Sequence, residues 1–132
     1  MKLRLSDIAH ARSGDKADTA DIGVFAWEPL GYSLLSQHLS TERIQTYFAH
    51  LWSVTVDTPE TAFKRVERFD LPNLLALKFV LRGSLNGGAA SSLRSDNLGK
   101  TIAAQLLHMQ IEVDDVQAHA ALLAAQTEIS RF

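Results

Sequence analysis

The spacing of apolar and polar residues predicts strands first and helices second in the amino-terminal half. After a short opening strand, residues 21–27 are rich in β-branched and aromatic side chains and stop at Glu28-Pro29, as a core strand would. From residue 30 to residue 51 the apolar spacing becomes helical. Ser40 and Thr41 interrupt it at a point where a new helix could be capped. We therefore expect two consecutive helices, or one bent helix, after the core strand.

The middle of the chain predicts a β-hairpin. Residues 63–69 and 74–81 have the composition of strands, and Leu71-Pro72-Asn73 between them has the composition of a turn. The preceding connection, residues 53–61, contains Pro59. Because side chains alternate along a strand, one face of the second strand would be buried and the other mixed. The residues on the expected buried face are Leu75, Leu77, Phe79 and Leu81, and those on the mixed face are Ala76, Lys78, Val80 and Arg82.

The last third of the chain predicts a helix, a strand and a second helix. Apolar residues recur at helical spacing at Leu98, Ile102, Leu106 and Met109. Asp96 is a candidate cap for this helix. Residues 109–113 alternate as a strand does, and Asp114 or Asp115 could cap an alanine-rich helix that ends near Ile129. The order is that of an α+β, ferredoxin-like βαββαβ sandwich with an antiparallel sheet, an extra N-terminal strand and a C-terminal helix.

Composition narrows the functional classes. The chain has 132 residues, 46% of them hydrophobic, which suits one globular domain. It has no cysteine, so disulfides, thiolate zinc sites, iron–sulfur clusters and a cysteine nucleophile are excluded. The formal charge of −2 gives no overall positive field toward nucleic acid or an anionic membrane. No segment has the pattern of a signal peptide or a membrane span, so we expect a cytoplasmic protein.

A polar segment near the amino terminus is the first candidate site. Residues 11–18 are predicted to form a loop between the opening strand and the core strand. Such a loop can present backbone amides, a guanidinium and an ammonium to a phosphate or carboxylate. By composition alone it is more often a solvated turn whose side chains pair with one another. The candidate ligand-binding residues are Arg12, Ser13, Gly14, Asp15, Lys16 and Asp18.

A glycine-rich segment before the penultimate helix is the second candidate. Glycines let the backbone approach a ligand, and helix amino termini attract anions, although a flexible connector has the same composition. The candidates here are Gly87, Gly88, Ser92, Arg94 and Lys100. Gly99-Lys100-Thr101 resembles the end of a P-loop, but that motif requires a glycine where this chain has Arg94, so a nucleotide P-loop is rejected. In a βαββαβ fold the two candidate loops could lie near one another.

Catalytic and metal-binding patterns are weak. The five histidines form no recognised metal pattern, so no metal or other cofactor is predicted. His10 and Asp15 are the only candidates for an acid or base, and His10 is too close in sequence to Ser13 for a serine triad to be expected. The hairpin is locally basic but lacks the aromatic motif of RNA-recognition domains, so RNA binding is only a weak alternative. A basic sheet face could equally meet the phosphates of a coenzyme or an acidic partner surface. The basic residues are Lys64, Arg65, Arg68, Lys78 and Arg82.

Several strings of this sequence, in order and at matching spacing from about residue 8 to residue 113, resemble one family. They include Ala9-His10-Ala11-Arg12-Ser13-Gly14-Asp15-Lys16, Ile22-Gly23, Tyr47-Phe48, Leu71-Pro72-Asn73-Leu74, Phe79-Val80-Leu81, Gly87-Gly88, Ser92-Leu93-Arg94, Asp96 and Gly99-Lys100. The family is the ferredoxin-fold domain at the carboxyl end of acyclic terpene utilisation protein A (AtuA). The resemblance implies a ferredoxin-like AtuA-type domain at residues 1–113 and a C-terminal helical extension at residues 114–132.

The resemblance also implies a metabolic setting. Larger relatives look like participants in the catabolism of acyclic terpenes and branched acids through acyl-CoA intermediates. We therefore expect a small accessory or ligand-binding subunit that binds an anionic group or docks on a larger acyl-CoA-metabolising partner. The alternatives are part of a hydratase or lyase active site, and a structural module that forms a homodimer. Ala17, Asp21 and Asn86 depart from the family pattern, and the carboxylate of Asp21 would weaken binding of an anion.

Overall fold

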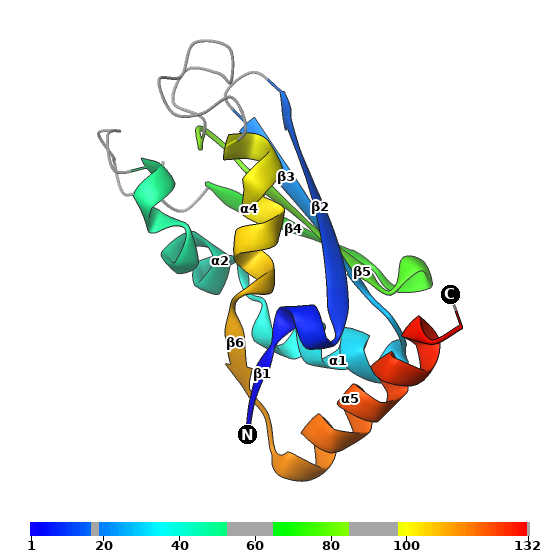
Figure 1. The fold of residues 1–132 in the computed structure, drawn as a ribbon. Helices are drawn as coiled ribbons and strands as arrows, with labels where there is room; N and C mark the ends of the chain where they lie inside the picture. Colours follow the sequence, from blue (N-terminus) through cyan, green and yellow to red (C-terminus); the bar gives the residue numbers. More distant parts are fainter. Residues whose placement is uncertain (17–18, 53–64, 85–97, 132) are drawn as a thin grey trace.

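A four-stranded antiparallel sheet of order β2-β3-β5-β4 forms the centre of the computed structural model (Figure 1). The structure describes residues 1–16, 19–52, 65–84 and 98–131. The strands of this sheet are β2 (Ala9–Lys16), β3 (Thr19–Ala26), β4 (Val66–Leu71) and β5 (Ala76–Leu81). The ferredoxin-like α+β fold expected from the sequence is confirmed.

Helices cover one face of this sheet. Helix α4 packs on β2 and β3, α1 on β3 and β5, and α2 on β4 (Figure 1). The helices are α1 (Pro29–His38), α2 (Thr41–Tyr47), α4 (Leu98–Leu107) and α5 (Asp115–Ile129), with short 3-10 helices η1 (Leu5–Asp7), η2 (Ala49–Trp52) and η3 (Pro72–Leu74). The opposite face of the sheet is called the open face below.

The core lies between the sheet and the helices. The side chains of β3 that point toward the helices, Ile22 and Val24, are fully buried, as are Leu77 and Phe79 of β5. Burial of such side chains stabilises the fold by about 1.5–3 kcal/mol each, which makes this layer the main source of stability. The buried face expected for the second hairpin strand is confirmed except at Leu75, which lies before β5 in the left-handed conformation.

The predicted helix starts are confirmed at two places. The Ser40 hydroxyl accepts a hydrogen bond from the backbone N–H of Arg43, which separates α1 from α2 as expected. The Asp114 carboxylate accepts one from Gln117 at the start of α5. Side-chain acceptors at this position satisfy helix N–H groups that have no partner within the helix. The predicted connection at residues 53–61 and the predicted cap at Asp96 lie outside the described residues.

The first and last strands form a sheet of their own. Strand β1 (Lys2–Arg4) pairs antiparallel with β6 (Gln110–Glu112), and neither strand joins the four-stranded sheet. The residues that flank and form β6, Met109, Ile111 and Val113, are all buried, as their alternation predicted. The position beside β3 that the last strand of a βαββαβ sheet would take is occupied by β2.

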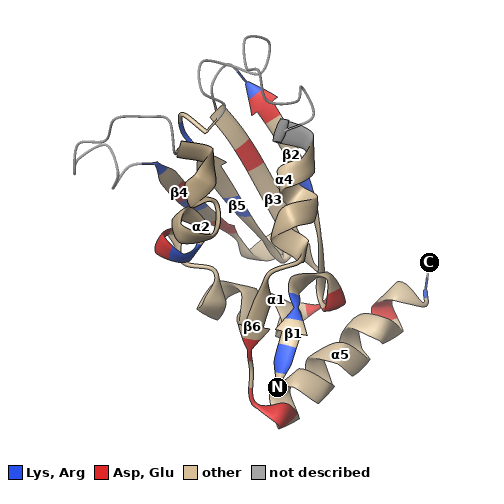
Figure 2. Ribbon diagram, turned by 60° about the vertical axis from the view of Figure 1, so that its left-hand side comes forward, with Lys and Arg blue, Asp and Glu red and all other residues tan. Residues whose placement is uncertain are grey.

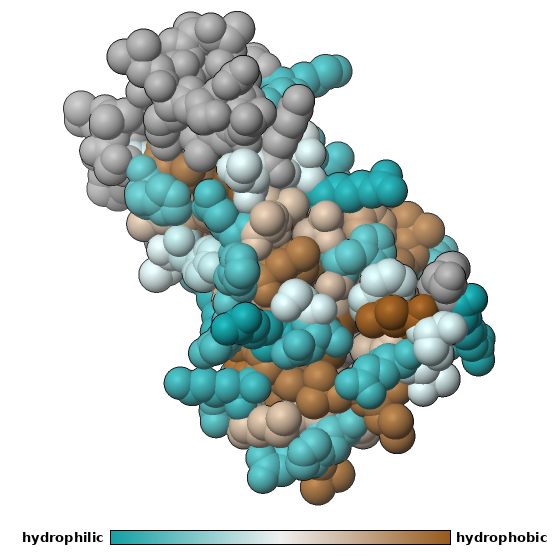
Figure 3. All heavy atoms as spheres, viewed as in Figure 1, coloured by the Kyte–Doolittle hydropathy of each residue, from teal (hydrophilic) through white to brown (hydrophobic). Residues whose placement is uncertain are grey.

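Helix α5 packs on α1 and exposes apolar side chains on its outer side. Its inner residues Ala118, Ala121 and Ala125 are fully buried, so the helix approaches the domain through small side chains. Val116 is 81% exposed and Leu123 is 67% exposed. In Figure 3 several hydrophobic residues reach the surface in the lower half of the molecule, where α1 and α5 lie in Figure 1. Among the described residues, no helix is long and apolar enough to cross a membrane.

Candidate binding site on the open face of the sheet

The polar segment expected to be a loop is a strand. Residues 9–16 form β2, and each of them is paired with a residue of β3, from Ala9 with Ala26 to Lys16 with Thr19. The prediction of a loop was wrong because charged residues and glycine have low strand propensity, whereas pairing along the whole of β3 compensates for that propensity here. The predicted site residue Asp18 and its neighbour Ala17 lie outside the described residues.

Because side chains alternate along β2, the strand divides the candidates between two faces. Ser13 lies opposite Ile22 and therefore points toward the helices, where its hydroxyl oxygen lies 3.4 Å from the backbone N–H donor of Ala103 in α4. Asp15 lies on the same side, opposite Ala20. Ser13 and Asp15 therefore cannot share one cradle with Arg12, which points to the other face.

The open face carries the remaining candidates of β2. His10, Arg12, Gly14 and Lys16 alternate with the residues of the helix-covered face. The last two residues of β2, acidic Asp15 and basic Lys16, point to opposite faces of the sheet. Figure 2 colours the charged positions of the strands. The residues beside these candidates on the open face are Thr19, Asp21, Gly23 and Phe25 of β3, Ala76, Lys78 and Val80 of β5, and Glu67, Phe69 and Leu71 of β4.

Two cations face each other across a glycine at the centre of the open face. Gly23 pairs with Arg12 on one side and with Lys78 on the other. The two Cα atoms are about 10 Å apart, because neighbouring strands lie about 4.8 Å apart. Both side chains are exposed, and neither forms an ion pair with a residue that the structure describes. A Cβ placed on Gly23 would stand 3.0 Å from the Phe25 ring, so an anion that contacts both cations lies above the edge of this ring.

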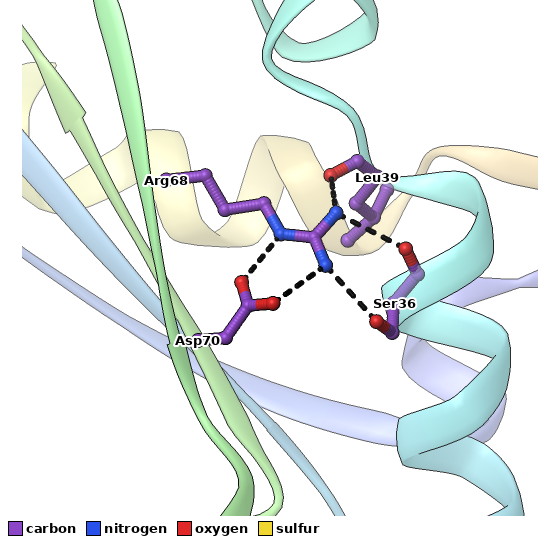
Figure 4. Close-up of polar contacts among 4 residues, drawn as sticks. All are labelled: Ser36, Leu39, Arg68 and Asp70. Carbon is purple, nitrogen blue, oxygen red and sulfur yellow. Dashed lines mark hydrogen bonds and ion pairs between the residues drawn. The ribbon is translucent and has the colours of Figure 1, made fainter.

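Arg68, by contrast, is held within the fold. Its guanidinium donates to the backbone oxygens of Ser36 and Leu39, at 3.0 and 2.9 Å, and pairs with Asp70 at 2.7 Å (Figure 4). It points to the helix-covered face, where it joins β4 to the end of α1. Carbonyl groups at a helix end have no partner within the helix, so this arginine satisfies them.

Two other basic residues of the hairpin also have partners. Arg82 pairs with Glu67 on the open face, with Nε 2.6 Å from the carboxylate oxygen Oε1. Arg65 is buried with its guanidinium carbon 5.2 Å from the centre of the Trp52 ring, and this burial lowers its pKa. Lys64 lies outside the described residues. Lys78 therefore differs from Arg65, Arg68 and Arg82 in having its charge available for a ligand.

Three rings lie beside the two cations. His10 stacks on Phe25, its partner across the strands, with ring centres 5.1 Å apart and planes at 13°. The Trp27 ring lies 4.8 Å from that of His10 at 44°. Partial burial and, secondarily, the nearby charge of Arg12 lower the pKa of His10. Both effects favour the neutral imidazole.

Asp21 adds one negative charge to this face. It pairs with Gly14 of β2, and a Cβ placed on Gly14 would stand 3.6 Å from the nearest carboxylate oxygen. Because Gly14 has no side chain, the carboxylate has room above β2. Asp21 borders the row of Arg12 and Lys78 on the side of Lys16 and Thr19, so it repels an anion that moves in that direction.

Only the ends of the glycine-rich segment are among the described residues. Gly87, Gly88, Ser92 and Arg94 lie outside the described residues. The Ser84 hydroxyl is buried, accepts a hydrogen bond from the Ala20 N–H and donates one to the carbonyl oxygen of Leu81. The segment therefore leaves the sheet beside the first residues of β3. It ends at α4, which packs on β2, and Lys100 lies in the first turn of that helix as expected.

Sequence reasoning placed Lys78 on the mixed face of its strand but did not connect it with Arg12. It also missed Gly23, Phe25 and Trp27 as site residues. The available signal was alternation: once residues 9–16 are taken as a strand, Arg12 shares a face with His10. Within the part of the chain that the structure describes, no three histidine or carboxylate side chains are grouped as a metal site.

Comparison with known families supports the resemblance. The profile of the AtuA ferredoxin-like domain matches residues 3–112. The chain belongs to this family. The match spans the strands and helices from β1 to β6, including the whole of the open face. Neither a curated protein nor a solved structure shows significant similarity to the chain.

Proposed function

We propose that this AtuA ferredoxin-like domain is an accessory, anion-binding module of acyl-CoA-linked catabolism, and that Arg12 and Lys78 bind the anion. The observation that carries the proposal is the pair of exposed cations on either side of Gly23. The other arginines of the hairpin are engaged within the fold, so charge available to a ligand is concentrated at this point. A guanidinium and an ammonium suit a phosphate or a carboxylate.

The choice of ligand class rests on the charge of the site and on the family. Coenzyme A carries several phosphates, and two cations about 10 Å apart can contact one phosphate or two linked ones. Lys16 lies on the same face and adds to the positive potential. Asp21 opposes it and restricts the anion to the central row. A larger acyl-CoA-metabolising chain would then be the partner that uses the bound ligand.

Isothermal titration calorimetry of the full chain with inorganic phosphate, coenzyme A and a short acyl-CoA tests the proposal. Arg12→Ala and Lys78→Ala should each weaken binding about tenfold or more, because a charge-assisted hydrogen bond contributes about 1.5–3 kcal/mol. Lys2→Ala is the matched control, since it removes one charge from an exposed position on the separate β1–β6 sheet. Equal affinities in all the variants, or no binding of any probe, would overturn the proposal.

A second candidate function is favoured by His10. Its neutral imidazole lies on the same face as Arg12, two residues away along β2. This is the arrangement of a general base beside a group that binds an oxyanion or carboxylate. Asp15 points to the opposite face, so the hydratase or lyase hypothesis now rests on His10. It predicts enoyl-CoA turnover that His10→Gln abolishes and Asp15→Asn leaves unchanged.

The third hypothesis, a structural module that forms a homodimer, predicts a different outcome. Such a module would give no heat with any of the probes and would sediment as a dimer in analytical ultracentrifugation. Sedimentation alone does not separate the hypotheses, because a binding module can also associate. The decisive combination is a dimer that binds none of the three probes.

A further inference from the structure

The anion site borders a group of aromatic rings that the proposed function does not use. His10, Phe25 and Trp27 are each partly exposed, and the His10 ring is stacked on that of Phe25 and tilted against that of Trp27. Exposing aromatic surface to water is unfavourable unless something covers it. The helices that pack on the sheet lie on its other face, so they do not cover these rings.

The rings and the cations lie in neighbouring rows of the sheet. His10 and Phe25 form one row across the two strands. Arg12 and Gly23 form the next row, two residues later along β2 and two residues earlier along β3. Two residues of strand span about 7 Å. A Cβ placed on Gly23 would stand 3.0 Å from the Phe25 ring, so this ring leans along β3 toward the cations. The glycine thus lets the aromatic row approach the charged row closely.

We propose that this face binds a nucleoside phosphate, with the base on the rings of His10 and Phe25 and the phosphate between Arg12 and Lys78. The inference rests on the proposed function and narrows its ligand. A ribose separates a base from its phosphate by about the spacing of the two rows. Base stacking on aromatic side chains contributes about 1–3 kcal/mol per base, and arginine adds cation–π attraction.

The neighbouring groups favour this orientation of the ligand. Asp21 lies beyond the cations on the side away from the rings, where it repels a phosphate and keeps it in the row of Arg12. Trp27 extends the aromatic surface on the other side. The base therefore lies on aromatic surface, and the phosphate lies above the edge of the Phe25 ring, between Arg12 and Lys78. A simple carboxylate or inorganic phosphate would contact the two cations and leave the aromatic rings uncovered.

Two ligands share this chemistry, a free mononucleotide and the nucleotide end of coenzyme A. Calorimetry with adenosine 5′-monophosphate, adenosine, inorganic phosphate and coenzyme A separates them. The monophosphate should bind at least tenfold more tightly than adenosine or inorganic phosphate. If coenzyme A binds more tightly still, the coenzyme is the source, whereas equal affinity identifies the free nucleotide; both results support the inference.

Phe25→Leu tests the stacking directly. It should reduce the affinity for the monophosphate about tenfold and leave the affinity for inorganic phosphate unchanged. Phe69→Leu is the matched control, because Phe69 lies on the same face at the edge strand, beside Lys78. Tryptophan fluorescence should be quenched by the monophosphate, and Trp27→Phe should remove the quenching. If Phe25→Leu does not fold, as judged by circular dichroism, His10→Leu tests the same stack.

The two proposals fail in different ways. If inorganic phosphate binds in an Arg12-dependent manner and the monophosphate binds no more tightly, the nucleotide inference is overturned and the proposed function remains. If neither phosphate nor nucleotide binds, both are overturned. Binding of the monophosphate that is unchanged in both Phe25→Leu and His10→Leu would also overturn the inference, since the base would then lie elsewhere.

Discussion

The two faces of strand β3 differ in what their side chains do. Toward the helices the strand presents Ile22 and Val24, which are fully buried. On the other face the alternate positions are Asp21, Gly23 and Phe25, which remain partly exposed. One strand thus supplies both the core and the floor of the candidate site. The residues of the first face are replaceable only by similar apolar groups, whereas those of the second are not held by core packing.

The basic residues follow the same division. Arg68 points toward the helices and is saturated by two backbone oxygens and Asp70. Arg12 points to the open face and has no ion-pair partner among the described residues. A guanidinium with all its donors engaged contributes to stability, and one with its donors in water is available for binding. Substitutions on the two faces should therefore separate stability from affinity.

The largest expected difference is between two phenylalanines on adjacent strands. Phe79 is fully buried on the helix-covered face, whereas Phe69 on the open face is 46% exposed. Phe79→Ala should lower the free energy of unfolding by about 3–5 kcal/mol, because it leaves a cavity. Phe69→Ala should lower it by less than about 1 kcal/mol. Urea denaturation measures both, and equal losses would contradict the division of the sheet into two faces.

Arg68→Met should have the next largest effect. It removes the donors of the Ser36 and Leu39 carbonyl groups, and unsatisfied buried acceptors cost about 1–3 kcal/mol. Arg12→Met is the control and should change the free energy of unfolding by no more than about 0.5 kcal/mol. In a binding titration with phosphate, Arg12→Met should lose more affinity than Arg68→Met. A loss of affinity in Arg68→Met as large as in Arg12→Met would contradict this view.

Ser13→Ala gives a finer test, because Ser13 is adjacent to Arg12 but points to α4. Loss of its hydroxyl should reduce the free energy of unfolding by about 1 kcal/mol. Phosphate affinity should remain that of the unaltered protein. Weakened binding without any loss of stability would show that Ser13 contacts the ligand, as predicted from the sequence.

The smallest expected effect is a pH dependence that arises from His10. Its pKa is lowered in the folded protein, so the unfolded chain binds the proton more readily. The free energy of unfolding should therefore fall as the pH drops below about 6.5 and passes through the folded pKa. His38, whose pKa is lowered by burial and then by Arg43, contributes in the same direction. In thermal unfolding measured over a range of pH, His10→Gln should remove the contribution of His10 to the pH dependence of the free energy of unfolding. The contribution of His38 should remain in that variant and disappear in His38→Gln.

Much of the architecture followed from periodicity. The helical spacing around Ser40, the alternation of the hairpin strand and that of residues 109–113 each placed an element correctly. These patterns are strong because the core selects apolar side chains at fixed intervals. Strand β2 was not predicted because small side chains alternate with His10 at its amino-terminal end and the remaining residues are polar or glycine. The strand therefore shows no alternation of large apolar and polar residues. Its pairing with β3 is a tertiary property.

The sequence by itself determined the apolar layer, the helix starts and the chemical types available for binding in the Arg12 segment. Only the tertiary structure decided which of those types share a face. Alternation along β2 sends Arg12 to the open face and Ser13 to α4, and pairing with β3 and β5 brings Lys78 beside Gly23. The physical reason is that burial leaves a local pattern in the chain, whereas a site assembled across strands depends on register. Within the polar segment, Arg12 therefore lies on the candidate binding face, whereas Ser13 lies on the face that packs against the core.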